Sequence, residues 1–228
     1  MLGVDGCATG WIAASRDARG RVTCRRVATL EELLGDLRPP SVAAVDVPIG
    51  LPERGARACD ELARRLLGVR RVSVFPPPIR PVLAATSYAE ASSIRFAVDG
   101  KRMSIQAWAI VPRIAEMDRF LDGDPVRRAI VHEAHPEVSF LHLGGGRPMA
   151  ASKHTSAGRA RRWALLRRWR RALPHPARTA RTFGCKVDDV LDALVLLWTA
   201  ERIRRGRAIR IPATPPLDAR GLRMEIVA

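Results

Sequence analysis

The sequence predicts an α/β domain built on a mixed sheet, and its N-terminal part carries the observations that predict it. Three strand-like segments separated by turn signals come first, at residues 2–4, 11–15 and 22–27, which is typical of an antiparallel meander. After a helix, the run at residues 42–46 is apolar without alternating. Such a run is expected to be buried on both faces, parallel to the first strand.

The middle of the chain predicts helices and rigid extended segments rather than further strands. Thr29 is a good N-cap for a helix over residues 30–37, which Pro39 and Pro40 end. Helices are then expected at residues 58–67, 88–97 and 104–121, with a proline-rich extended segment at 72–78. Pro112 predicts a kink or a break in the third of these helices. We therefore expect residues 1–228 to form one domain with a helical and extended insertion around 53–128.

The C-terminal half returns to a strand and ends in helices. A buried strand is expected at residues 129–132, and Glu133 stands at its end. Helices are expected at residues 156–173 and 188–205, the second with a core-facing apolar stripe. The tail at residues 208–228 has extended character.

Composition limits the function classes. The chain has 228 residues, of which 47% are hydrophobic, and a formal net charge of +16. Such charge fits a nucleic-acid partner, DNA or RNA, although arginine enrichment is also what a GC-rich genome produces. The chain shows no membrane-span or signal-peptide pattern, and its cysteines lack disulfide or zinc spacing, so we expect a cytoplasmic protein. The oligomeric state stays open, with a homodimer as one alternative.

Acidic residues recur where buried elements end or begin, and we interpret them as one site. Asp5 lies on the first strand and Asp46 ends the 42–46 strand. Asp189 and Asp192 share one face of the last helix. Carboxylates held close together repel one another, which a divalent cation relieves, and Mg²⁺ or Mn²⁺ prefers such oxygen ligands.

Each of these acids also has a purely structural explanation. Asp5 and Asp46 could be turn residues, and the first turn of a helix favours acidic residues anyway, which we expect to explain Asp188 as a cap. Glu133 and Glu137 compete for a fourth carboxylate position, and Glu137 could instead cap a helical turn. Lys153 could meet a phosphate or a site carboxylate, or be a solvated loop lysine.

The helix at residues 156–173 combines many arginines with two tryptophans. We interpret Arg159, Arg162, Arg167 and Arg170 as contacts to a nucleic-acid backbone, with Trp and Leu on another face toward the core. Nothing in this segment indicates reading of individual bases.

Several motifs together resemble a known family. They are Val4-Asp5-Gly6-Cys7, Val45-Asp46-Val47-Pro48, His135-Pro136-Glu137 and Asp188-Asp189-Val190-Leu191-Asp192. This combination resembles the predicted RNase H-like nuclease family, long catalogued as domain of unknown function 429. The resemblance implies the RNase H-like fold, a mixed five-stranded sheet with helices on both sides. By position, Asp5 and Asp46 match the strand acids, and Asp189 and Asp192 are similar to paired aspartates on the last helix of RuvC-type resolvases.

The resemblance and the residues lead to one preferred function and two alternatives. The preferred function is a metal-dependent nuclease with a site for two Mg²⁺ or Mn²⁺ ions, held by Asp5, Asp46, Asp189 and Asp192. The first alternative is a nucleic-acid-binding module of the same fold without turnover. The second is a nucleotide-binding enzyme related to the sugar kinase and actin lineage, which would require two lobes.

Overall fold

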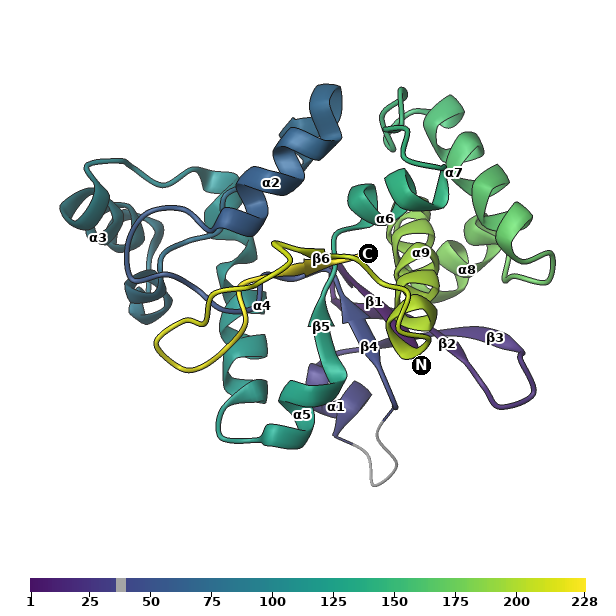
Figure 1. Cartoon of the computed structure of the whole chain (residues 1–228), viewed down its shortest axis with the longest axis horizontal. Coiled ribbons are helices and arrows are strands. Elements are labelled where there is room, and N and C mark those ends of the chain that lie inside the picture. The colour runs from purple at the N-terminus through teal and green to yellow at the C-terminus, as the bar shows by residue number, and fades with distance from the viewer. Residues whose placement is uncertain (36–39) are drawn as a thin grey trace.

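A five-stranded mixed sheet forms the centre of the computed structural model, which describes residues 1–35 and 40–228 (Figure 1). Its strand order is β3-β2-β1-β4-β5. The bounds are β1 (Leu2–Cys7), β2 (Gly10–Arg16), β3 (Val22–Val27), β4 (Ala43–Val45) and β5 (Val131–Glu133). The first three strands are antiparallel, and β4 runs parallel to both β1 and β5. The predicted α/β class, the meander and the parallel strand are confirmed.

Helices surround the sheet and make up the segment between β4 and β5. Their bounds are α1 (Leu30–Leu34), α2 (Ala58–Leu67), α3 (Tyr88–Asp99), α4 (Ile105–Leu121), α5 (Pro125–Ile130), α6 (Pro136–Leu143), α7 (Ser156–Trp169), α8 (Pro176–Phe183) and α9 (Val187–Arg204). Two 3₁₀ helices, η1 (Gly68–Ser73) and η2 (Arg80–Ala84), lie between α2 and α3. Thr29 caps α1 as predicted, and the predicted end of that helix at residues 36–39 lies outside the described residues.

Four local predictions are corrected by the structure. The strand expected at 129–132 begins only at Val131, because Asp124 caps a short helix that continues to Ile130. The segment expected to be extended from residue 72 is still 3₁₀ helix through Ser73. The helix containing Pro112 is continuous, so the break that was one of the two expected outcomes does not occur. The proline lies on the exposed side, where water can reach the freed carbonyl. The arginine-rich helix ends at Trp169 rather than residue 173.

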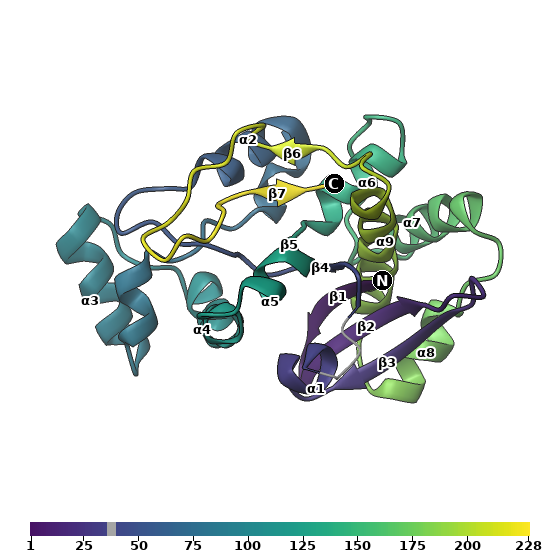
Figure 2. The same cartoon turned by 60° about the horizontal axis from the view of Figure 1, so that its bottom comes forward.

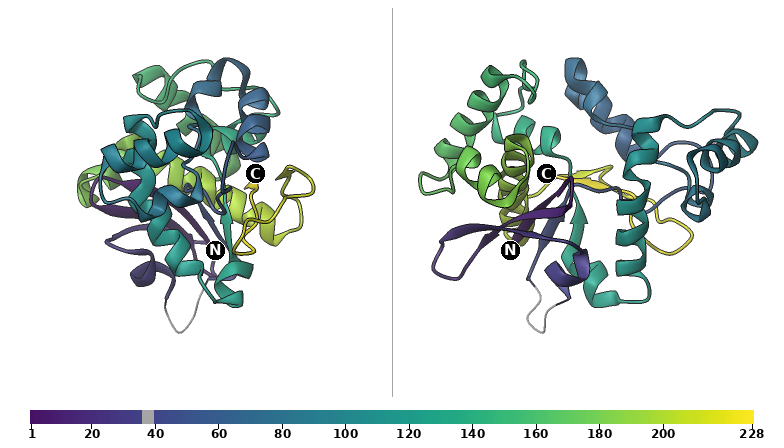
Figure 3. Two further views of the ribbon diagram at one scale, coloured as in Figure 1. Left: turned by 90° about the vertical axis from the view of Figure 1, so that its left-hand side faces the viewer. Right: turned by 180° about the vertical axis from the view of Figure 1, so that it is seen from behind.

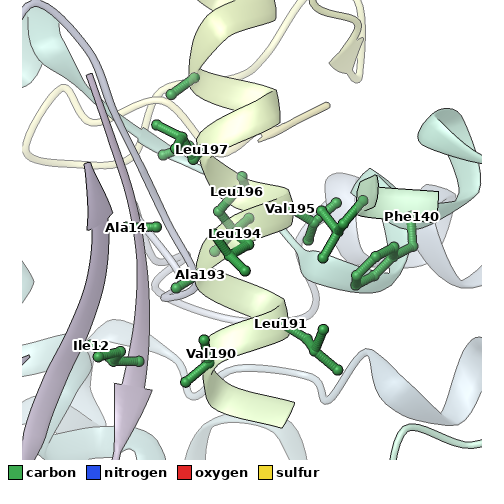
Figure 4. Close-up of a cluster of buried hydrophobic side chains, with 14 of the residues drawn as sticks. Ile12, Ala14, Phe140, Val190, Leu191, Ala193, Leu194, Val195, Leu196 and Leu197 are labelled. Carbon is green, nitrogen blue, oxygen red and sulfur yellow. The ribbon is translucent and has the colours of Figure 1, made fainter. Parts of the chain in front are cut away.

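Helix α9 packs directly on the sheet and determines what lies near β1. A Cβ on Gly3 would be only 2.0 Å from the backbone nitrogen of Leu197 and 2.3 Å from the carbonyl oxygen of Ala193. The helix backbone therefore touches the strand backbone, a contact that only glycine allows. Apolar side chains of α9 fill the core on this face, together with Ile12, Ala14 and Phe140 (Figure 4).

The opposite face of the sheet is covered by α1 and α4. The segment after α4 returns through α5 to β5, while η2, α3 and the start of α4 form a smaller core of their own. A two-stranded ribbon, β6 (Arg210–Ile211) and β7 (Ile226–Val227), crosses near the C-terminus (Figure 2). In two opposite views α2 and α7 stand on either side of the carboxyl ends of β1, β4 and β5 (Figures 1 and 3).

Candidate functional site

The register of the parallel strands brings Asp5 and Asp46 together. Val4 pairs with Val45, so the residue after each stands beside the other, and the backbone nitrogen of Asp46 donates to the carbonyl of Val4 at 2.9 Å. Because side chains alternate along a strand, both carboxylates lie on the face opposite to the two valines. The two predicted strand acids are thus adjacent, on the side of the sheet that α9 covers.

Asp192 completes a cluster with these two acids. The close approach of α9 to β1 places its first turns beside Asp5, and Asp192 is only 1% exposed. Burial first, and then the charges of Asp46 and Asp192, raise the pKa of Asp5 well above its usual range. Burial raises the pKa of Asp192 to about 6, although Lys153 opposes the shift. The repulsion between carboxylates that the sequence predicts contributes to both shifts, but less than burial does.

Lys153 lies among these carboxylates as a cation. Its Nζ donates to Oδ2 of Asp192 at 2.6 Å. The charge of Asp192, followed by those of Asp5 and Asp46, raises the pKa of Lys153 far above its usual range. The loop that carries Lys153 is held by Gly158 of α7, where a Cβ would lie 1.8 Å from the carbonyl oxygen of Ser152. Lys153 is therefore positioned by the packing of its loop, and the solvated-lysine alternative is not what the structure has.

The donor set of this cluster suits a hard divalent cation. Oδ1 of the buried Asp192 and Oε2 of Glu137 have no hydrogen-bond partner among the described residues. Of these two residues Glu137 lines the cavity described below, and Asp192 is buried next to it. Unpartnered carboxylate oxygens are ligands that Mg²⁺ or Mn²⁺ prefers. Within residues 1–35 and 40–228, however, no three acidic, histidine or cysteine side chains are arranged as ligands around one point.

The structure distinguishes Glu133 from Glu137. Glu133 pairs with Val45 across the strands, so its side chain lies on the face opposite to Asp46. There Nη2 and Nη1 of Arg57 donate to its two oxygens at 2.6 and 2.7 Å, and burial raises its pKa to about 7. Glu137, in the first turn of α6, comes close enough for its charge to raise the pKa of Asp192. Glu137 is thus the fourth carboxylate beside the cluster.

The capping aspartate of α9 is Asp189, whereas Asp188 was expected in that position. Asp189 forms the cap, because its Oδ2 accepts from the backbone nitrogen of Lys186 at 2.9 Å. Asp188, expected to be the cap, is buried, and its Oδ2 lies 3.3 Å from Nδ1 of His154. Asp189 still stands near enough to contribute to the raised pKa of Asp5, and burial raises its own pKa.

The predicted backbone-contact arginines divide into different groups. Arg162 is 0% exposed, and its Nη2 donates to Oε1 of Glu137 at 2.5 Å, so its assignment to a nucleic-acid surface is wrong. Arg170 donates to Glu201 at 3.2 Å and Arg159 to the carbonyl of His154 at 2.9 Å. Arg167 is exposed and stacks over Trp163. The helix period explains the error, because Arg162 lies on the same face of α7 as the buried Gly158, Leu165 and Leu166, whereas Arg167 lies on the exposed face.

Comparison with known proteins gives one match, which covers nearly the whole chain. The family described as "Protein of unknown function (DUF429)" matches residues 3–217. The chain belongs to this family. No curated protein and no solved structure matches it.

In this DUF429 protein the carboxylates face a cavity of about 490 Å³ at the carboxyl ends of the strands. Asp5, Asp46, Glu137 and Lys153 line it, together with Val72 and Phe75 of the segment after α2. No helix in residues 1–35 or 40–228 combines the length and apolar character of a membrane span.

Sequence reasoning missed several residues of this cavity in the DUF429 protein. Arg113 of α4 donates to the carbonyl of Cys7 and would touch a Cβ on Gly6, so it flanks Asp5. Arg70 of η1 also lines the cavity, and its Nε is buried without a partner among the described residues. Both arginines are far from the acids in sequence and follow no motif, so no local signal identifies them.

Proposed function

We propose that this protein is a metal-dependent nuclease, which hydrolyses phosphodiester bonds of nucleic acid at the cavity between α2 and α7. The observation that carries the proposal is the cluster of Asp5, Asp46 and Asp192 around a single ammonium group, with Oδ1 of Asp192 unpartnered in the described structure. One lysine neutralises only part of that charge. The remainder favours binding of further cations.

Asp5, Asp46 and Asp192 would hold Mg²⁺ or Mn²⁺ after a rearrangement of their side chains, since no three ligands surround one point in the described structure. Asp189, nearer to solvent, would contribute to a second ion. When bound there, such ions supply an activated water and stabilise the leaving oxygen. The residues of the chain have the remaining tasks. Arg70 and Arg113 line the same cavity and offer guanidinium donors to a phosphodiester. Arg162 orients Glu137 toward Asp192 through the buried ion pair at 2.5 Å.

The arrangement of the elements supports the RNase H-like assignment within this proposal. The resemblance implies a mixed five-stranded sheet with helices on both faces and acids on the first strand, the fourth strand and the last helix. The sheet with the order β3-β2-β1-β4-β5 is mixed and has five strands. Asp5 lies on β1, Asp46 directly follows β4, and Asp192 lies on α9, the last helix.

The experiment is a titration of Mg²⁺ and Mn²⁺ into wild-type protein and Asp5→Asn, with cleavage followed on a substrate panel. The panel holds single strands, duplexes, RNA–DNA hybrids and four-way junctions. We expect cleavage by the wild type only, with metal binding weakened in the variant. Full cleavage by Asp5→Asn would refute the carboxylate mechanism.

A nucleic-acid-binding module without turnover is the second candidate, and the position of Lys153 favours it. An ammonium 2.6 Å from Asp192 can neutralise the cluster without a metal. In that case the panel shows salt-dependent binding but no cleavage, and Mn²⁺ does not bind to the wild type.

A further inference from the structure

An exposed apolar ridge borders the acidic cavity. It consists of Leu66, Val69, Val72 and Phe75, which are between 46% and 82% exposed. They recur every third residue, and Val69 and Val72 lie in the 3₁₀ helix η1, where side chains three apart are aligned. Leu66 precedes η1 at the end of α2, and Phe75 follows it. Large apolar side chains gathered on a surface in this way indicate a binding surface.

The ridge runs into the cavity that holds the carboxylates. Val72 and Phe75 are part of the cavity lining, whereas Lys153 and His154 line it from the loop before α7. The cavity lining therefore combines apolar side chains and one aromatic ring with charged groups of both signs. Arg70, one residue beyond Val69, contributes a guanidinium group to it.

This combination of apolar and charged groups matches the two parts of a nucleotide. A nucleobase has apolar ring faces that stack on aromatic side chains, and the phosphodiester beside it carries the negative charge. The cavity volume of about 490 Å³ is that of a site for a small molecule. It can take up an unpaired nucleotide, whereas a base inside a duplex has both ring faces covered by the neighbouring base pairs and cannot stack on Phe75.

We propose that the cavity binds an unpaired nucleotide, with the base stacked on Phe75 and Val72 and the phosphodiester held by Arg70 and Arg113 beside Asp5 and Asp46. The inference rests on the nuclease function proposed above and defines its substrate class. That class is single-stranded nucleic acid or the unpaired end of a duplex. Because every base has a ring face, the site does not select one base by stacking alone.

The test is binding of a fluorescent single-stranded oligonucleotide, measured by anisotropy without divalent metal so that cleavage does not interfere. It is compared with an abasic strand of the same length and with a blunt duplex. We expect the wild type to bind the strand with bases about tenfold more tightly than the abasic strand, which is the size of one stacking contact. Phe75→Ala should lose this tenfold preference and keep its affinity for the abasic strand, whereas Phe75→Trp should retain the preference.

Phe96 on α3 gives a matched control. It is 52% exposed, against 51% for Phe75, and it does not line the cavity. Phe96→Ala should therefore bind all three probes as the wild type does. Equal effects of the two alanine variants would overturn the inference.

The outcomes separate this inference from the proposed function. The unpaired-nucleotide site is overturned if the protein binds the base-containing and abasic strands equally, or if it prefers the blunt duplex. If metal-dependent cleavage is observed in the same experiments, the nuclease proposal still holds. Absence of both cleavage and binding overturns both proposals, and the ridge would then be a docking surface for a protein.

Discussion

Nζ of Lys153 lies 2.6 Å from Oδ2 of Asp192, so the cavity contains a positive charge of its own among the buried carboxylates. A cation bound to Asp192 would have to share the carboxylate with this ammonium group or displace it. The stability of the metal-free protein and its affinity for metal are therefore linked through one side chain.

Lys153→Met should destabilise the metal-free protein by about 2 kcal/mol, because it leaves Asp192 buried and unpaired. The same change should increase the affinity for Mn²⁺, since the competing ammonium is gone. Urea unfolding and calorimetric Mn²⁺ titration measure the two effects. Lys101→Met, which alters an exposed lysine, should change neither. Unchanged stability together with weaker Mn²⁺ binding in Lys153→Met would refute the competition.

Asp5→Asn should stabilise the metal-free protein while it abolishes metal binding. The pKa of Asp5 is raised, first by burial and then by Asp46 and Asp192, so its ionised form is disfavoured in the folded state. Asparagine has nearly the same shape and no charge, so we expect the free energy of unfolding to increase at neutral pH. Thermal unfolding at pH 7.5 checks the sign, with exposed Glu61→Gln as the control. A loss of stability would mean that the charge of Asp5 is neutralised in the fold.

The sequence was sufficient to predict the sheet and the two strand acids, because both depend on short-range patterns. Turn signals separate the first three strands, and the apolar run before Asp46 does not alternate. The position of Glu133 depends instead on the pairing of Val45 with Glu133, which is a property of the register. A shift of one residue in register exchanges the two faces of a strand, and one sequence does not determine it.

The arginines near the candidate site could not be predicted for a related reason. Arg57 pairs with Glu133, and Arg113 reaches the end of β1, across long separations in the chain. Such contacts arise from the packing of the insertion against the sheet and leave no local pattern. Arg162 is the converse case. It belongs to an arginine-rich segment of the sequence, which predicts an exposed position, but it lies on the buried face of α7.

The pH dependence of stability should identify Asp192. Its folded pKa of about 6 exceeds the usual value of 3.8, so its favourable contribution is complete below about pH 4 and is lost as the pH rises toward 6. In that window the wild type should lose up to about 1.4 kcal/mol per pH unit relative to Asp192→Asn. Urea unfolding without metal at pH 4.5 and 6.5 measures the difference.

Asp218 is a control of opposite sign for this pH experiment. Burial raises its pKa, but hydrogen bonds from the backbone nitrogens of Leu222 and Leu51 outweigh burial and hold the pKa below its usual value. The contribution of Asp218 to the free energy of unfolding is therefore present when the pH is above its usual pKa, and it is lost as the pH falls through the lowered pKa of the folded state. Asp218→Asn should accordingly lose more stability at pH 6.5 than in acid. The same slope in both variants would contradict the assignment of Asp192.

Gly158→Ala should test whether α7 positions Lys153. Alanine normally stabilises a helix by about 1 kcal/mol relative to glycine. Here the new Cβ would lie 1.8 Å from the carbonyl oxygen of Ser152, so the loop must move, and we expect a loss of about 2 kcal/mol instead. Mn²⁺ affinity should rise as in Lys153→Met, because the ammonium group leaves Asp192. Ala160→Gly, on the exposed side of α7, should reduce stability by about 1 kcal/mol without changing Mn²⁺ affinity.

The arginines of α7 should divide into a structural and a binding class, which Arg162 and Arg167 represent. Arg162→Met leaves Glu137 buried and unpaired, and we expect a loss of about 3–5 kcal/mol in urea unfolding. Arg167→Ala removes an exposed guanidinium and should leave the free energy of unfolding within about 0.5 kcal/mol of the wild type.

The same two variants should reverse their order in nucleic-acid binding. If Arg167 contacts a phosphate, its loss weakens binding of every sequence equally and lowers the slope of log affinity against log salt by about 1. Arg162→Met, studied at a temperature where it remains folded, should keep the wild-type slope because its side chain never meets solvent. Anisotropy between 50 and 200 mM salt, about the range over which such contacts are resolved, measures both slopes. A reduced slope for Arg162→Met with an unchanged slope for Arg167→Ala would mean that α7 does not present its outer face to the nucleic acid.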